Sequence, residues 1–263
     1  MLVVLGCGTF RQGAVVQALG LPTYVTKAAG SAHKLRRAAP NAKVALFTDR
    51  ETLENWQSRA ERALMGAARR RPKPGCEATS TDNACAAPAP EAAVDLFGAL
   101  SPFDYIAVYD GEGGITVPEI PRAAEQSRWQ KSGSLWARKI ATYQHTPFNH
   151  TLFTDSDACA CYARGQSRLK NLKGLIGKAD FVTVMDDKGH GGTPPPPYDP
   201  KRPVPMEFDE RNGGFNMYKQ TRATEALFRA WMEVFLWHAA QGDKLPKVTH
   251  DQPALREAVR TGA

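Results

Sequence analysis

Short apolar runs alternate with longer amphipathic stretches along most of the chain. Apolar runs of four to eight residues that end in polar or turn residues are typical of strands buried on both faces of a parallel sheet. On this pattern we predict strands at MLVVLG (1–6), KVALFTD (43–49), FDYIAVYD (103–110), LFTD (152–155), DFVTVMDD (180–187) and, after a glycine turn, within RNGGFNMYK (211–219).

Apolar residues at three-to-four spacing predict helices between these runs. The predicted helices cover residues 24–39, 51–68, 127–144 and 221–241, and a last helix begins near Asp251. Alternating strands and helices imply an α/β sandwich with a mostly parallel central sheet flanked by helices. We therefore expect one domain of this class over residues 1–263.

Two segments interrupt the alternation. Residues 69–93 have no periodic apolar pattern and are typical of a flexible insertion. The second segment is a Pro-rich loop at about 189–205, in which four consecutive prolines exclude a helix or a central strand.

The composition is that of a packed globular protein. The 263 residues are 42% hydrophobic and 23% charged, which excludes disorder throughout because enough apolar surface is available to offset chain entropy. No run approaches the roughly 18 apolar residues that span a bilayer, so we expect no transmembrane segment in these residues. The opening MLVVLGC is too short for a signal sequence and is better interpreted as a strand.

The net charge indicates which classes of partner the protein could attract, and the cysteine spacing indicates which kinds of site it lacks. Lysine and arginine number 34 against 27 acidic residues, a net charge of +7, which attracts nucleic acid, an anionic membrane face or a phosphorylated small molecule. Part of the excess lies in the predicted insertion, and no nucleic-acid-binding module is recognisable, so we expect no nucleic acid partner. The five cysteines include no CxxC pair and predict neither a zinc site nor a disulfide framework.

The sharpest chemical feature is the sequence Asp155-Ser156-Asp157, directly after a predicted strand. In extended backbone the two carboxylates point to one face and the serine to the other. Two converging carboxylates repel each other unless a cation lies between them, and Mg²⁺ and Mn²⁺ prefer oxygen ligands. The sequence therefore predicts a metal site, although a D-x-D also arises by chance as turn or capping aspartates.

Cations and glycines in other segments suit the same kind of ligand. Arg138 and Lys139 lie 17 and 16 residues before Asp155 on the predicted preceding helix, where a forked guanidinium can bind phosphate oxygens. Asn212 can hydrogen-bond to a sugar hydroxyl, and Gly213 permits close approach of the backbone to a ligand. The alternatives are solvated helix residues for the cations and a plain turn for Asn212 and Gly213.

The last helix opens with His250-Asp251-Gln252-Pro253. An aspartate at the N-cap with a proline in the first turn is a sufficient structural explanation for Asp251 and Pro253. Capping does not explain His250 and Gln252.

Together these segments resemble nucleotide-diphospho-sugar glycosyltransferases of the GT-A fold, nearest to families 8 and 77 with their plant and algal members. The similar segments, in the order of that family, are KVALFTD (43–49), WARK (136–139), TLFTDSDAC (151–159), RNGGFNMYK (211–219) and HDQPALREAV (250–259).

The resemblance implies a role for each matching residue. Asp155 and Asp157 match the D-x-D that holds Mn²⁺ or Mg²⁺ against the donor diphosphate, with Ser156 between them in the donor-binding motif. Arg138 falls where related enzymes place an arginine near the donor phosphate and sugar. Asp49 is the loosest match and is expected to contact the nucleoside.

The resemblance also implies a sugar pocket and a reaction centre. Asn212 and Gly213 match the turn that lines the sugar pocket. Asp251 and Gln252 match the D-Q pair near the donor sugar. If the reaction inverts configuration, Asp251 and Asp186 are candidate general bases; if it retains configuration, no strong base is required.

Two departures from the family pattern affect these expectations. Related enzymes often place a third metal ligand, usually histidine, after the D-Q pair, and this chain has no histidine after His250. Either another residue supplies that ligand, or the chain is incomplete at its C-terminus, as we expect. The amino end, LVVLGCGTFRQG, matches the family's first strand and nucleoside-binding loop only weakly.

The expected function is metal-dependent transfer of a sugar, with a uridine diphosphate sugar as donor, to a hydroxyl of a glycan, protein or lipid. Many relatives are Golgi enzymes with a membrane anchor, so we expect the Golgi lumen if such an anchor is missing from this chain and the cytoplasm otherwise. The alternatives are a non-catalytic transferase-like protein, a polyanion-binding protein and a haloacid-dehalogenase-type phosphatase. In that phosphatase Asp155 is the nucleophile, Asp157 the acid/base, and Asp186 and Asp187 bind the metal.

Overall fold

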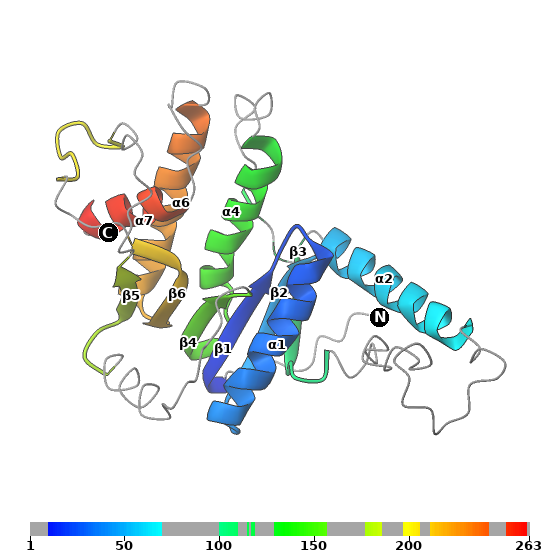
Figure 1. Ribbon diagram of the computed structural model, residues 1–263. Helices are drawn as coiled ribbons and strands as arrows, with labels where there is room; N and C mark the ends of the chain where they lie inside the picture. Colours follow the sequence, from blue (N-terminus) through cyan, green and yellow to red (C-terminus); the bar gives the residue numbers. More distant parts are fainter. Residues whose placement is uncertain are drawn as a thin grey trace.

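The computed structural model describes residues 10–69, 100–109, 115, 117–118, 129–156, 177–185, 197–205, 211–241 and 251–261. Within them six strands form one sheet in the order β3-β2-β1-β4-β6-β5 (Figure 1). The strands are β1 (Phe10–Ala18), β2 (Lys43–Asp49), β3 (Tyr105–Tyr109), β4 (Phe148–Asp155), β5 (Phe181–Met185) and β6 (Arg211–Lys219). Neighbouring strands from β3 to β4 are parallel, and β6 is antiparallel to both β4 and β5.

Helices cover both faces of this sheet. They are α1 (Pro22–Ala38), α2 (Arg50–Arg69), α4 (Trp129–Gln144), α6 (Arg222–Gln241) and α7 (Asp251–Thr261). The prediction of an α/β domain with a mostly parallel sheet flanked by helices is confirmed, and the predicted helices match the described ones closely. Among the described helices none combines the length and apolar character that a membrane span requires.

Neighbouring residues of the central strands face opposite cores, which explains their continuous apolar runs. On β1, Ala14 and Val16 pack into the core under α1 and α2, whereas Val15 packs into the core under α4, α6 and α7. The second core is the more aromatic, and Tyr143 and Trp231 are among its largest buried side chains.

The flanking helices change from one face of the sheet to the other, and the place where they change marks a ligand-binding position. The helices that follow β1 and β2 lie on one face, and α4, which precedes β4, lies on the other (Figure 1). Such a switch point, at the carboxyl ends of parallel strands, is where open α/β sheets bind ligands. Here it lies between β1 and β4, where Gln17 pairs with Asp155.

Strands β1 and β6 were not predicted as the structure has them. The predicted strand at residues 1–6 lies outside the described residues, and the strand before α1 is Phe10–Ala18, which was not predicted. Its apolar run is short because Gln17 interrupts it, and this buried amide donates a hydrogen bond to Thr142 Oγ1 at 2.8 Å. Gly213 and Gly214 belong to β6 itself and are not a turn before it.

Both predicted interruptions are described only in part. Of the predicted insertion at 69–93, the structure describes Arg69, the last residue of α2. Of the Pro-rich loop, it describes residues 197–205, which contain no helix or strand. This part lies against α7: Glu257 accepts a hydrogen bond from the Tyr198 backbone N–H, and Arg256 donates one to the Pro205 carbonyl.

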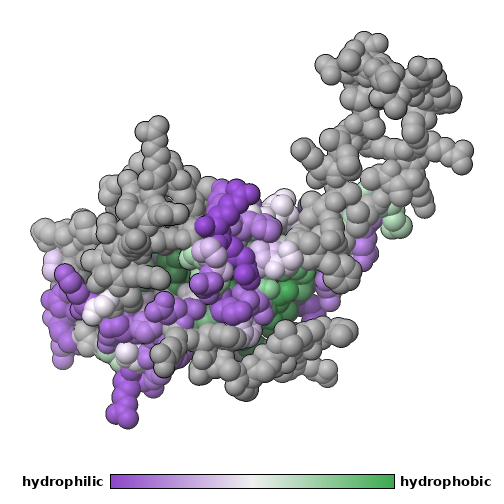
Figure 2. All heavy atoms as spheres, turned by 90° about the horizontal axis from the view of Figure 1, so that it is seen from below, coloured by the Kyte–Doolittle hydropathy of each residue, from purple (hydrophilic) through white to green (hydrophobic). Residues whose placement is uncertain are grey.

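The described surface offers little apolar area for docking. Seen from below, most of it is hydrophilic, and apolar side chains show mainly in the middle of the face (Figure 2). The large apolar side chains that are exposed within the described residues come from separate places in the fold: Leu21, Met65, Ile106, Val184 and Tyr198.

A half-buried carboxylate, that of Asp104, fixes the start of β3 against β2 and α1. Asp104 accepts hydrogen bonds from the Val44 backbone N–H at 2.9 Å, from Lys43 Nζ at 2.9 Å and from Arg36 Nη2 at 2.7 Å. Burial alone would raise the pKa of Asp104, but these three donors outweigh it and hold the pKa below its usual value. Asp104 therefore stabilises the fold at pH values above about 4, and this contribution is lost as the pH falls through the lowered pKa.

Replacing Asp104 by asparagine should lower the free energy of unfolding at pH 7 by about 1–3 kcal/mol, because the three donors lose a charged acceptor. The difference from wild type should shrink as the pH falls below about 4 and through the lowered pKa of Asp104, because the wild-type carboxylate is then protonated. Urea unfolding at a series of pH values measures both effects. Asp199→Asn, at an exposed pair with Arg202, is the control. A constant difference across the pH series would contradict the assignment.

Candidate active site

Three charged side chains from three elements meet at the carboxyl end of β4. Asp155 is the last residue of that strand, and its side chain is 30% exposed. Lys139 of α4 is only 6% exposed, and its Nζ lies 2.9 Å from Asp155 Oδ2 and 3.2 Å from Asp251 Oδ2. Asp251, at the start of α7, is 2% exposed. We call Lys139, Asp155 and Asp251 the charged triad.

The two carboxylates keep Lys139 charged in a buried position. Burial alone would lower the pKa of Lys139 because it disfavours the ammonium form. Asp251 and Asp155 outweigh that effect and raise the pKa above its ordinary value. Lys139 is therefore positively charged at physiological pH and offsets one of the two carboxylate charges beside it.

Several contacts place Asp251 in this cluster. It is an acidic residue in the first turn of α7, where the helix dipole favours negative charge. Its backbone carbonyl accepts a hydrogen bond from Trp231 Nε1 of α6 at 2.7 Å. Its carboxylate packs against the backbone of Gly213, since a Cβ added there would lie 2.2 Å from Asp251 Oδ2. Gly213 is thus required for space beside the charged triad.

Arg138 and Lys139 are adjacent on α4. Sequence analysis assigned the phosphate-binding role to Arg138 and named Lys139 only as a second cation, and the structure places Lys139 in contact with Asp155. Arg138 lies in the same turn of α4, and its backbone carbonyl accepts hydrogen bonds from Tyr109 and Thr142. The Arg138 side chain is partly exposed, and its contact with a donor phosphate stays a prediction.

Gln252 and Ser156 lie next to members of the triad in the chain. Gln252 follows Asp251 on α7 and is buried. Ser156 follows Asp155 and is also buried, and its backbone carbonyl accepts a hydrogen bond from Ser31 Oγ of α1 at 3.3 Å. Their predicted contacts with a donor stay predictions.

Asp49 has a clear structural role. Its carboxylate accepts hydrogen bonds from the Thr52 backbone N–H at 2.7 Å and from the Thr52 hydroxyl at 2.6 Å, which caps α2. It also accepts the Gly20 N–H at 3.1 Å, in a turn where φ is 82° and glycine is favoured. Asp49 thereby joins α2 to the turn after β1, and the predicted nucleoside contact stays a prediction.

The predicted metal ligands fit a hard divalent cation in part. Asp155 presents carboxylate oxygens at a partly exposed strand end, and such oxygens suit Mn²⁺ and Mg²⁺. Asp157, Asp186, Asp187 and the side chain of Asn212 lie outside the described residues. Among the side chains that are described, no three His, Cys, Asp or Glu residues are arranged to hold a metal ion. The two-aspartate metal site therefore stays a prediction.

Two side chains of α4 were underestimated from the sequence. Lys139 was named only as a second cation, and Tyr143, four residues later, was not singled out. Residues four apart on a helix share a face, so their common orientation could have been predicted. Their polar partners on β6 and α7 come from distant parts of the chain and give no local signal.

Comparison with known proteins finds distant similarities among solved structures. No protein-family model matches the chain, and no curated protein sequence matches it. The solved structures include core-mannan synthase A from Aspergillus fumigatus in its Mn/GDP form, which is similar with a TM-score of 0.45 and 8% sequence identity over 95% of this chain and 70% of that chain. A similarity of this size does not assign a function, which depends on the residues at the end of β4.

Replacing Lys139 by glutamine should lower the free energy of unfolding by about 3–5 kcal/mol at pH 7, because two carboxylates lose their buried cation. The wild-type contribution is complete below a pH of about 10.4 and is lost only as the pH rises through the raised pKa of Lys139. Denaturant unfolding measures the loss. Lys219→Gln, at the more exposed pair with Asp180, should cost much less, and equal costs would contradict the burial argument.

Replacing Gly213 by alanine should lower the free energy of unfolding by about 1–3 kcal/mol, because the methyl group collides with the Asp251 carboxylate. Gly30→Ala on α1, where a Cβ meets nothing within 4 Å, is the matched control and should be stabilising by up to about 1 kcal/mol. Thermal unfolding of both variants provides the comparison. An alanine at position 213 that leaves stability unchanged would show that this part of β6 is free to move away from Asp251.

Proposed function

We propose that the protein is a GT-A-type glycosyltransferase that transfers a sugar from a nucleoside diphosphate sugar to an acceptor hydroxyl. The observation that carries the proposal is the charged triad at the carboxyl end of β4, beside the β1/β4 switch point. This is the edge of the sheet where a phosphorylated ligand is expected. A fixed cation and a partly exposed carboxylate occur together there.

The triad suits the departure of a diphosphate. Negative charge develops on the nucleoside diphosphate as the sugar leaves, and a preorganised cation in a partly buried site stabilises that charge. Lys139 is held in place by two carboxylates and needs little reorganisation to act in this way. We assign the same role to Arg138, one residue earlier on α4.

In this proposal Asp155 and Asp157 hold Mn²⁺ or Mg²⁺. The bound metal supplies Lewis-acid stabilisation of the diphosphate oxygens. Asp251 and Gln252 at the start of α7, with the backbone at Gly213, form the side of the site that faces the donor sugar, because carboxylate and amide groups bind sugar hydroxyls.

Finer features of the proposal rest on the resemblance of the sequence motifs. They are a uridine diphosphate sugar as donor, membership of the families related to 8 and 77, and contact of Asp49 with the nucleoside and of Asn212 with the sugar. The acceptor is a hydroxyl of a glycan, protein or lipid.

The direct test is binding of nucleoside diphosphates in the presence and absence of Mn²⁺, measured by calorimetry, followed by nucleotide release from a panel of uridine and guanosine diphosphate sugars. We expect metal-dependent binding by the wild type. The nucleotide affinity of Asp157→Ala should be more than tenfold lower, since substitutions around metal sites typically cost about 10–100-fold. Asp199→Ala is the surface control.

Two outcomes would contradict the proposal. Unchanged nucleotide binding by Asp157→Ala would remove the metal-dependent mechanism. Release of inorganic phosphate with a covalent phosphate trapped on Asp155 would instead identify a phosphatase.

A further inference from the structure

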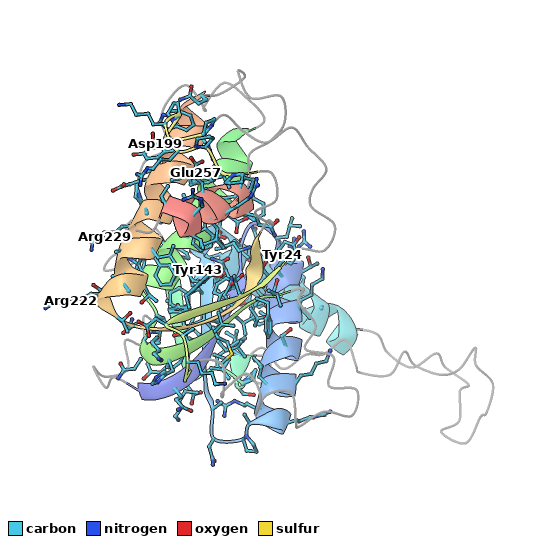
Figure 3. The ribbon with its side chains drawn as sticks, turned by 90° about the vertical axis from the view of Figure 1, so that its left-hand side faces the viewer. Tyr24, Tyr143, Asp199, Arg222, Arg229 and Glu257 are labelled. Atoms are coloured by element: carbon cyan, nitrogen blue, oxygen red, sulfur yellow. The ribbon has the colours of Figure 1, made fainter. Side chains whose placement is uncertain are left out.

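Helix α4 presents a second polar group on the face that carries Lys139. Tyr143 follows Lys139 by four residues, so the two side chains project from the same side of the helix. The Tyr143 side chain lies in the interior, between the sheet and α6 (Figure 3). Its ring stacks on Phe153 of β4, with centroids 4.3 Å apart, and meets the edge of Trp231 of α6 at 5.0 Å. These contacts hold the ring in one place.

The hydrogen bonds of the Tyr143 hydroxyl have a defined direction. Asn216 Nδ2 lies 2.6 Å from the hydroxyl oxygen, and the Gly213 carbonyl oxygen lies 2.8 Å from it. An amide NH₂ only donates and a carbonyl only accepts, so the single hydroxyl proton is given to Gly213. Burial raises the pKa of Tyr143 well above its usual value, which keeps this proton in place.

The strand that contains Gly213 lacks regular pairing at this point. Between Thr183 and Met185 the register of β5 against β6 shifts, and the two residues pair with Asn216 and Arg211 respectively. Gly213 lies within that irregular segment. The hydrogen bond from Tyr143 therefore restrains a carbonyl that is not part of a regular β5–β6 ladder there.

These contacts form a closed circuit around the candidate active site. Tyr143 holds the Gly213 carbonyl, the Gly213 backbone packs against Asp251, and Asp251 pairs with Lys139 on the same helix as Tyr143. A shift of the Gly213 peptide moves the surface against which the Asp251 carboxylate rests. It thereby changes how the Lys139 ammonium is shared between Asp251 and Asp155.

We propose that Tyr143 is a positioning residue of the candidate active site, which acts through the Gly213 peptide on the charged triad. Asn216 donates a hydrogen bond to the Tyr143 hydroxyl oxygen, which leaves the hydroxyl proton for Gly213, and Asn216 thereby supports the same positioning role. The effect on donor binding rests on the proposed function, whereas the coupling of Tyr143 to Asp251 does not.

Tyr143→Phe tests this role, and Tyr218→Phe is the matched control. Tyr218 lies in the same aromatic cluster, with its ring 5.4 Å from that of Tyr143, and is fully buried. Its hydroxyl lies near those of Thr151 and Thr146, and within the described residues it has no hydrogen-bond partner. Each substitution thus removes one buried hydroxyl from one cluster, but only the first removes the hydrogen bond to Gly213.

The first measurement is a pair of double-mutant cycles with Asp251→Asn, read from unfolding equilibrium constants in urea. Tyr143→Phe and Asp251→Asn should be non-additive by about fivefold or more, and Tyr218→Phe and Asp251→Asn should be additive within about twofold. Additivity in both cycles overturns the proposal. If Asp251→Asn does not fold, the Lys139 ammonium resonance in ¹⁵N-lysine-labelled protein decides: it should shift in Tyr143→Phe and not in Tyr218→Phe.

The second measurement is the dissociation constant of the nucleoside diphosphate that wild type binds with Mn²⁺. We expect the dissociation constant to rise about five- to tenfold in Tyr143→Phe, which corresponds to the loss of about one hydrogen bond to a buried polar group. It should stay unchanged in Tyr218→Phe. Equal values in the two variants overturn the positioning role. If wild type binds no nucleotide, the proposed function fails, and the cycles still decide whether Tyr143 positions the triad.

Discussion

The ammonium of Lys139 is the constraint on which the candidate site depends. It brings together two carboxylates that would otherwise repel each other, one at the end of β4 and one at the start of α7. Desolvating three charges is unfavourable, so the arrangement persists only because the charges are paired at close range and fixed by their elements. Such an arrangement is costly for stability alone and is typical of a site that binds a charged ligand.

The fold supplies the parts that hold this cluster. The parallel strands bring Asp155 to the switch point beside β1, and the aromatic core under α4, α6 and α7 fixes the angle of α4. A hydrogen bond from Trp231 joins α6 to the first residue of α7, and Gly213 leaves space for the Asp251 carboxylate. The contacts that pack the core are therefore also the contacts that set the geometry of the site.

The sequence predicted the class of fold and most elements because apolar periodicity is a local signal, and it selected Asp155 and Asp251 because both follow clear element boundaries. It missed the strand Phe10–Ala18, since Gln17 is a buried polar residue whose partner, Thr142, is 125 residues away. It named Lys139 only as a second cation. The contacts of Lys139 with Asp155 and Asp251 depend on how α4 rotates against its neighbours, and that rotation is set by tertiary packing.

The central claim is that the charged triad forms the diphosphate end of a donor site. A crystal structure of the protein with Mn²⁺ and a nucleoside diphosphate tests it most directly. The account predicts that the diphosphate lies at the carboxyl end of β4, with Asp155 on the metal and Lys139 beside the phosphate oxygens. A nucleotide bound at another edge of the sheet, with Lys139 still enclosed between its two carboxylates and remote from the phosphates, would contradict it.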